Sequence, residues 1–427
     1  MMLPNGQGGT YRKRDLTIYL GIRFLSEAAA VAQSVAIGWT VYRLSNTALA
    51  LGIVGIVQFV PMILLTLPAG ELCDRVSPRR VLAIGLAIQS ICAAGFLLLT
   101  LFSGAPMADF VGPTTTGQPG ALWPFFILLS ALGGARAFTD PAGHALLPFL
   151  VPPERRARVI AWSSSAWQVA VIVGPALGGL AYALGPAVAY AMCGGGFLAA
   201  MLAVATLGDR RQAVPENSGP KDRVSRVAEG LAFVWSQPLV LGAISLDLFA
   251  VLLGGATALL PVYARDILHV GPIGLGLLRS APAVGASLVA LMQARHPPDR
   301  RVGLKLFAAV AMFGIATLIF ALSDSFGLSL AALFVLGGCD MVSVNIRSSL
   351  VQLATPDAMR GRVSAVNMLF IGASSELGAF ESGVAAALLG AVPAVAVGGI
   401  GTIVVAAVWM SAFPALRKAD RLLSISP

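Results

Sequence analysis

Long apolar segments separated by short polar ones run through the whole chain. Leu16–Val41 contains only two charged residues, and Ile53–Ala69 contains none. A helix needs about 20 consecutive apolar residues to cross a bilayer, so segments of this length predict membrane-spanning helices. The pattern predicts twelve of them, with expected bounds 16–42, 48–71, 81–103, 122–148, 159–184, 187–207, 238–263, 271–294, 303–323, 326–353, 362–389 and 391–413.

Composition agrees with an all-α membrane protein. Of the 427 residues, 57% are hydrophobic and only 11% are charged, whereas a soluble protein carries about 25% charged residues. The net charge of +9 does not indicate a nucleic-acid partner, because the basic residues form short clusters between the apolar segments. The four cysteines are widely scattered and the three histidines are isolated, so we expect no metal site and no cofactor.

The placement of Lys and Arg predicts the orientation in the membrane. One alternate set of loops holds 23 of the 29 Lys and Arg residues, the opposite set holds only Arg43 and Arg265, and four more lie inside spans. Basic residues favour cytoplasmic loops, so the split predicts an even number of spans with both termini in the cytoplasm. The first fifteen residues are polar and basic, which predicts no cleavable signal peptide. We expect a multi-pass protein of the plasma (inner) membrane of a bacterium.

The longest polar stretch, 209–228, divides the predicted spans six and six. It predicts an N-terminal six-helix bundle at 1–208, a cytoplasmic linker at 209–236 and a C-terminal six-helix bundle at 237–427. An internal repeat supports two halves. A shift of 204 residues overlays Gly133, Gly134, Pro152, Arg156, Arg158, Val159, Ala161, Gly174 and Gly179 on Gly337, Gly338, Pro356, Arg360, Arg362, Val363, Ala365, Gly378 and Gly383. A weaker match at 224 residues lays Leu51-Gly52 on Leu275-Gly276.

The turn between the second and third spans carries a motif, Gly70-Glu71-Leu72-Cys73-Asp74-Arg75-Val76-Ser77-Pro78-Arg79-Arg80. It resembles the loop signature of the major facilitator superfamily, although Ser77 and Pro78 stand where that family usually has Gly and often has Arg. The resemblance implies that Gly70, Asp74, Arg75, Arg79 and Arg80 form a cytoplasmic latch between the halves. Simple anchoring by basic residues is the alternative, and it leaves Asp74 unexplained.

The fifth span contains Gly174-Pro175-Ala176-Leu177-Gly178-Gly179. Small residues four positions apart let helices approach closely, and Pro bends a helix. The sequence resembles the fifth-span signature of drug/proton antiporters, with Gly174, Pro175, Gly178 and Gly179 as the matching positions. Ordinary small-residue packing is the alternative.

Four further segments resemble the enterobactin-exporter branch of the major facilitators, which includes macrolide-efflux-like proteins. They are Ala48–Gly52, Gly133–Phe138, Gly338–Val344 and Thr355–Asn367. This resemblance runs nearly end to end. It implies the major facilitator fold, with twelve transmembrane helices in two pseudo-symmetric six-helix halves, and it implies export. It does not name the cargo, because the branch is broad.

Charged residues inside the predicted spans are candidates for the transport chemistry, because each is costly in a bilayer without a partner or a wet cavity. Arg23 and Glu27 in the first span, and Arg136 and Asp140 in the fourth, are each four residues apart and can meet on one helix face. The proton-coupling candidates are Glu27, Asp140, Asp247 and Asp340. Their expected charge partners in the cavity are Arg23, Arg136, Arg279, Arg347, Glu376 and Glu381. For any one pair, the alternative is an ion pair that only stabilises packing.

The sequence therefore predicts a secondary transporter. We expect a monomeric, proton-coupled exporter of an amphiphilic small molecule, such as a siderophore or drug, that works by alternating access. Its partners are the cargo, protons and the lipid bilayer. An importer or lipid transporter of the same fold is the nearest alternative. A membrane-embedded enzyme is the remote one, because no catalytic constellation is evident.

Overall fold

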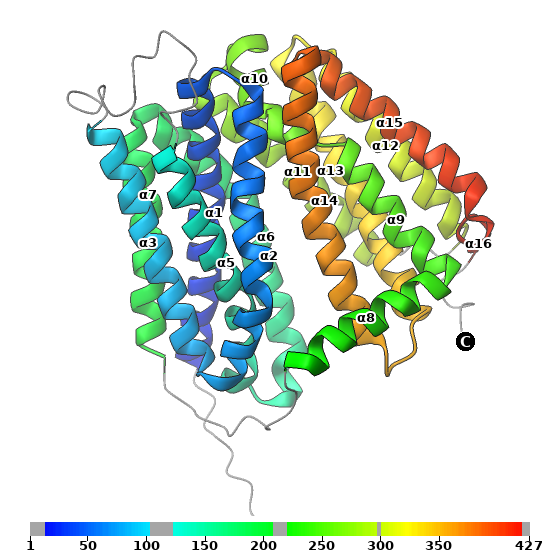
Figure 1. Cartoon of the computed structure of the whole chain (residues 1–427), viewed down its shortest axis with the longest axis horizontal. Coiled ribbons are helices and arrows are strands. Elements are labelled where there is room, and N and C mark those ends of the chain that lie inside the picture. Colours follow the sequence, from blue (N-terminus) through cyan, green and yellow to red (C-terminus); the bar gives the residue numbers. More distant parts are fainter. Residues whose placement is uncertain (1–12, 103–122, 208–219, 297–299, 421–427) are drawn as a thin grey trace, which may run out of the picture.

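The computed structural model describes residues 13–102, 123–207, 220–296 and 300–420. Within these ranges every regular element is a helix (Figure 1). The helices are α1 (Lys13–Ser45), α2 (Ala48–Arg75), α3 (Pro78–Phe102), α5 (Trp123–Leu150), α6 (Pro153–Leu184), α7 (Pro186–Ala205), α8 (Pro220–Ser236), α9 (Pro238–Leu253), η2 (Ala256–Leu259), α10 (Leu260–Val262), η3 (Tyr263–Ile267), α11 (Gly271–Arg295), α12 (Val302–Ala321), α13 (Phe326–Leu353), α14 (Arg360–Leu389), α15 (Ala391–Ala412) and α16 (Pro414–Arg417).

Eleven spans in the described residues are long and apolar enough to cross a membrane. Helix α5 coincides with the predicted fourth span and is 28 residues long, but it is not one of the eleven. Arg136, Asp140 and His144 lie within it and lower its mean hydropathy. Eleven of the twelve predicted spans are therefore found among the described residues, and α5, a long helix with a polar middle, occupies the place of the predicted fourth span.

The spans pack in two groups. Helices α1, α2, α3, α5, α6 and α7 pack on one another, and so do α9, α11, α12, α13, α14 and α15. The main contacts between the groups are α2 with α14 and α6 with α11. In Figure 1, α2 and α14 are closest at their upper ends and diverge toward the end that α8 crosses.

Close glycine contacts reproduce the sequence repeat in space. A Cβ on Gly133 would lie 2.1 Å from the carbonyl oxygen of Gln58, and a Cβ on Gly337 would lie 2.0 Å from that of Pro282. These contacts are related by the offsets of 204 residues for the glycines and 224 for their partners. Two further pairs of contacts obey the same offsets: Gly174 on Ala28 with Gly378 on Leu252, and Gly179 on Gly276 with Gly383 on Gly52. The weak 224-residue match thus reflects equivalent packing.

The two groups are joined at the end where α1 finishes. A Cβ on Gly383 of α14 would lie 2.8 Å from the Cα of Gly52 on α2. The hydroxyl of Tyr42 on α1 donates a hydrogen bond to Asp266 in η3. The guanidinium of Arg265 lies 5.4 Å from the centre of the Tyr42 ring and 3.6 Å from Asp266. These contacts close this end of the molecule.

The seventh span differs from the single helix predicted at 238–263. It breaks after α9 at Gly254-Gly255 and continues through η2 and α10 to the π-helical turn η3, which ends at Ile267. A Cβ on Gly255 would lie 2.6 Å from the carbonyl oxygen of Gly378. The glycine therefore lets the broken segment approach α14.

The predicted linker contains a helix that the sequence did not indicate. Residues 209–219 of the linker lie outside the described residues, and α8 occupies its remainder. Helix α8 packs on α14. Its Glu229 lies 2.5 Å from Arg362, and Val234 is buried. Helix α8, the second part of the linker, thus packs against the C-terminal group of helices and forms an ion pair with it.

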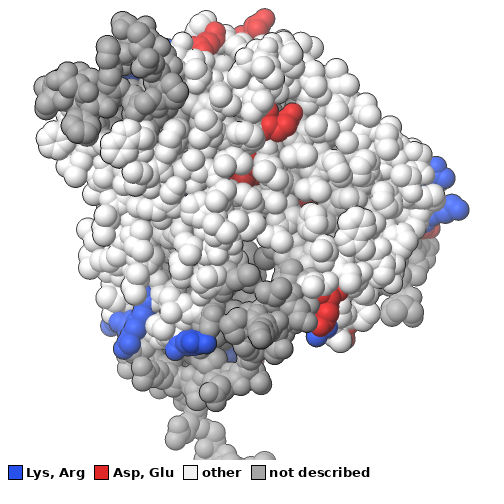
Figure 2. Space-filling view, viewed as in Figure 1, with Lys and Arg blue, Asp and Glu red and all other residues white. Residues whose placement is uncertain are grey.

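Away from the ends, the surface is apolar. On the face in Figure 2 most of the surface carries no charged side chain, and the basic residues gather at its lower and right margins. Large exposed apolar residues are spread along the spans, for example Leu64, Ile91 and Leu388. This distribution is typical of helices that face lipid.

Candidate functional site

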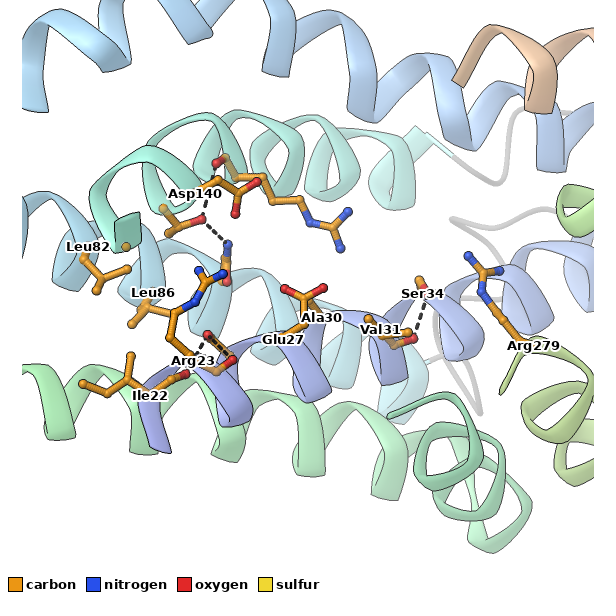
Figure 3. A pocket seen from close by; sticks show the side chains of 15 residues that line it. Ile22, Arg23, Glu27, Ala30, Val31, Ser34, Leu82, Leu86, Asp140 and Arg279 are labelled. Atoms are coloured by element: carbon orange, nitrogen blue, oxygen red, sulfur yellow. Dashed lines mark hydrogen bonds between the residues drawn. The ribbon is translucent and has the colours of Figure 1, made fainter. Parts of the chain in front are cut away.

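A cavity of about 270 Å³ lies among α1, α3, α5 and α11 (Figure 3). Five charged side chains line it: Arg23, Glu27, Arg136, Asp140 and Arg279. The first four come from the N-terminal group of helices, whereas Arg279 comes from α11 of the C-terminal group. Pockets for small organic ligands begin at roughly 300 Å³. The cavity thus has the size and polarity for part of a small organic molecule.

Helix geometry places the acidic and basic groups of the cavity together. Arg23 and Glu27 lie one turn apart on α1, and Arg136 and Asp140 lie one turn apart on α5. Glu27 is within Coulombic range of the other three, and the side chain of Trp167 on α6 hydrogen-bonds to it. Asp140 lines the cavity, and its side chain is exposed. The structure therefore brings the two predicted Arg–carboxylate pairs into one cluster.

The other two proton-coupling candidates lie elsewhere. Asp247 on α9 forms an ion pair with Arg347 on α13, and these residues are only 8% and 4% exposed. Asp340 is within Coulombic range of both. None of the three lines the cavity. Asp247 is committed to a buried partner, as expected for an ion pair inside a helix bundle.

Helix α14, which packs against α2 of the other group of helices, carries two acidic residues, Glu376 and Glu381. A Cβ on Gly55 of α2 would lie 3.0 Å from Oε2 of Glu376, so the glycine makes room for this carboxylate. Glu376 is also within Coulombic range of Arg136 and Arg279, one from each group. Glu381 is exposed and hydrogen-bonds to Ser382, near the closed end.

The loop motif lies at the opposite end, where α2 ends and α3 begins. The side chain of Asp74 lies outside the described residues. Arg79 donates to the carbonyl oxygens of Val204, at 3.0 Å, and Ala205, and so caps the C-terminus of α7 within its own group of helices.

The remaining motif residues have simple positions. Ser77 stands directly before α3, and its carbonyl oxygen accepts from the backbone N–H of Arg80 at 2.9 Å. The Oγ of Ser77 also accepts from the N–H of Arg80 at 3.4 Å, and Ser and Pro are residue types favoured at the N-cap and at the first helical position. Gly70 lies in the last turns of α2, and Arg75 and Arg80 are exposed.

The fifth-span motif serves two different contacts. Gly174 and Gly178 face α1, where a Cβ on Gly178 would lie 2.6 Å from the carbonyl oxygen of Ala32. Gly179 instead faces α11, where its Cβ would lie 2.3 Å from the carbonyl oxygen of Pro272. The carbonyl of Pro175 lies beside Gly276 of α11. This short segment of α6 therefore packs against α1 of its own group of helices and against α11 of the C-terminal group.

Sequence reasoning missed several polar residues of the cavity. Ser26 and Ser34 line it together with Glu27. Ser34 lies seven residues from Glu27 and Ser26 three from Arg23, and this helical spacing could have indicated both. Gln89 on α3, and Thr139 and Gly143 on α5, also line it. Gln89 and Gly143 carried no signal, because their position depends on how the spans are arranged around each other.

Comparison with known proteins gives one family. The model of the Major Facilitator Superfamily matches residues 19–379. The multidrug efflux pump Tap of Mycolicibacterium fortuitum is 26% identical over 362 residues, which are 82% of this chain and 83% of that protein. The enterobactin exporter EntS of Citrobacter koseri is 24% identical over 390 residues, covering 91% of this chain and 88% of the exporter.

Solved structures show the same fold at low sequence identity. A bacterial homolog of the human lysosomal transporter Spinster, in an inward-facing and unoccupied conformation, gives a TM-score of 0.70 at 14% identity and covers 99% of each chain. A peptide transporter POT in complex with sulfate gives 0.71 at 12% identity, covering 98% of this chain and 97% of the other. The predicted fold is confirmed.

Proposed function

The chain belongs to the major facilitator superfamily, and from this premise we propose that it is a proton-coupled exporter of an amphiphilic small molecule. The observation that carries the proposal is the cavity between the two groups of helices. It contains two carboxylates, Glu27 and Asp140, beside Arg23 and Arg136, with Arg279 reaching in from the other group. Export is suggested by the relatives, which are named as a multidrug efflux pump and an enterobactin exporter.

The two halves, 1–208 and 237–427, would rock about this cavity, with 209–236 as the linker between them. We place both termini in the cytoplasm because of the Lys and Arg distribution, since basic residues favour cytoplasmic loops. In that orientation the closed end, with Tyr42 and Asp266, faces outward. The structure then corresponds to an inward-open or occluded state of the cycle.

Glu27 and Asp140 supply the coupling in this proposal. A carboxylate that holds a proton in one state and contacts cargo in another makes the two ligands compete, and this competition is the requirement for antiport. The neighbouring arginines keep the deprotonated carboxylates tolerable in the bundle. Because the cavity holds both signs of charge, we infer a zwitterionic or amphiphilic organic cargo, such as a drug or siderophore, rather than a bare ion.

The first experiment is growth of an efflux-deficient bacterium that expresses this chain, across a panel of drugs and siderophores. The compound it identifies is then followed in proteoliposomes with and without an imposed pH gradient. One pH unit is about 1.4 kcal/mol per proton, so each proton exchanged supports about tenfold cargo accumulation. Equal cargo flux with and without the gradient would refute proton coupling.

An importer or lipid transporter of the same fold is the competing function. The direction of movement of the identified compound in inverted membrane vesicles separates the two. An exporter accumulates the compound inside inverted vesicles, whereas an importer depletes it there.

A further inference from the structure

The two halves carry opposite charges at equivalent positions. Helices α1 and α9 are related by the offset of 224 residues, as the equivalent contacts of Ala28 and Leu252 show. This offset places Arg23 at the position of Asp247. The offset of 204 residues between α5 and α13 places Gly143 at the position of Arg347. The pair Arg23 and Gly143 in one half therefore corresponds to the pair Asp247 and Arg347 in the other.

In the C-terminal half this place is filled by the buried ion pair of Asp247 and Arg347. In the N-terminal half the corresponding residues also lie against each other, because a Cβ on Gly143 would lie 3.0 Å from a terminal nitrogen (Nη1) of Arg23. Glycine, however, supplies no counter-charge. The guanidinium of Arg23 thus faces a residue without a side chain where its counterpart faces an ionic partner.

Arg23 also has a hydrogen-bond donor that is not used. Its Nε is buried and has no hydrogen-bond partner, although buried donors are nearly always paired. The ion pairs found between described residues all lie elsewhere: Arg265 with Asp266, Arg347 with Asp247, Arg360 with Asp357, and Arg362 with Glu229. Glu27 and Asp140 act on Arg23 at Coulombic range. Arg23 and Gly143 both line the cavity, and Figure 3 shows Arg23 beside it, near Asp140.

We propose that Arg23, set against Gly143, is the subsite for an acidic group of the cargo, such as a carboxylate. The acidic group pairs with Arg23 in the N-terminal half, as Asp247 pairs with Arg347 in the C-terminal half. A guanidinium matches a carboxylate with two parallel N–H···O bonds, which gives geometry as well as strength. Glu27 lies one turn further along α1 and receives the basic or hydrogen-bond-donating part of the same molecule. This inference rests on the proposed transport function and names the cargo class as one that bears an acidic group.

The test uses purified full-length protein and a matched pair of probes, benzoate and its neutral isostere benzamide. Thermal unfolding is followed at fixed pH over a range of probe concentrations, since a ligand that binds the folded state raises Tm. Benzoate is expected to raise Tm in a saturable way, and benzamide is not. In Arg23→Gln the apparent Kd for benzoate rises about tenfold or more, as expected for loss of a charged hydrogen-bond partner.

Three variants sharpen the result. Gly143→Asp supplies the missing counter-charge from within the protein, so it should remove the benzoate response while leaving a folded chain. Gly143→Ala adds a Cβ without the charge and should retain at least part of the response. Arg295→Gln removes an exposed arginine at the end of α11 and should leave the response unchanged.

Several outcomes would overturn the subsite. They are equal responses to benzoate and benzamide, an unchanged benzoate response in Arg23→Gln, or a normal benzoate response in a folded Gly143→Asp protein. If Gly143→Asp does not fold, the Arg23→Gln comparison decides. The measurement is an equilibrium one, so failure of proton coupling or of export in vesicles does not affect it. A benzoate response that depends on Arg23 supports the subsite even if transport proves to be import.

Discussion

The contact between α2 and α14 depends on Gly383 having no side chain. A Cβ there would lie 2.8 Å from the Cα and 2.9 Å from the backbone nitrogen of Gly52. These are backbone atoms and cannot turn aside, so Gly383→Ala must separate the helices. Overpacking of this kind costs about 1–3 kcal/mol. If this α2–α14 contact, here called the seam, opens during transport, only the closed state is destabilised. The equilibrium then shifts toward the open state by about 5- to 150-fold.

The assay is labelling of a cavity cysteine from the side of the closed end. The four native cysteines are replaced, Ser34→Cys is introduced into the cavity, and a membrane-impermeant maleimide is applied outside intact cells. Gly383→Ala should accelerate labelling by the factor given above. Gly372→Ala is the matched control on the same helix, because nothing lies within 4 Å of its added Cβ. It captures the gain in helix propensity, about 0.5–1 kcal/mol, without the strain.

A labelling rate in Gly383→Ala equal to that of the parent Ser34→Cys protein, with both proteins folded, would refute the reasoning. That result would mean that the seam is under the same strain in every state, so it does not open. Faster labelling in both variants would assign the effect to helix propensity.

Other predictions follow from contacts at the two ends and in the C-terminal half. A short reducible thiol cross-link between Tyr42→Cys and Asp266→Cys should block transport until it is reduced; transport that continues while cross-linked would show that this end stays shut throughout. Arg347→Met should lower the free energy of unfolding by about 3–5 kcal/mol, because it strands a buried Asp247, and adding Asp247→Leu should recover most of the loss in a thermal melt. Arg79→Gln should cost about 1 kcal/mol through the lost cap on α7, measured in the same melt, while a large loss of transport at unchanged stability would instead favour a latch role.

Much of the fold could be predicted from the sequence because a membrane restricts the options. Apolar segments long enough to span a bilayer must be helices, and the bounds of α13 match the predicted 326–353. The break at Gly254-Gly255 was not predicted, because two glycines inside an apolar run also suit ordinary packing. At the break Gly255 contacts Gly378 of α14, which is far away in the sequence and therefore invisible to a local pattern.

The site was predictable where helical spacing decides it. Arg23 and Glu27 are on one face of α1 by their spacing alone, and they line the cavity. The arrangement of the helices decided the rest. Asp247 has no basic residue within a turn of it on α9, so only the structure reveals that it is paired with Arg347 on α13. Gly143 could not be selected among 47 glycines, because its importance comes from the position of Arg23 against it.

The central claim is that cargo and protons compete for the cavity carboxylates. Cargo-driven proton movement in proteoliposomes tests it most directly: the liposomes are loaded with the identified cargo, no pH gradient is imposed, and an internal pH dye is followed. Efflux of cargo should acidify the interior as protons move in, and Glu27→Gln together with Asp140→Asn should abolish the signal. Cargo efflux with no change of internal pH, or with alkalinisation, would contradict the account.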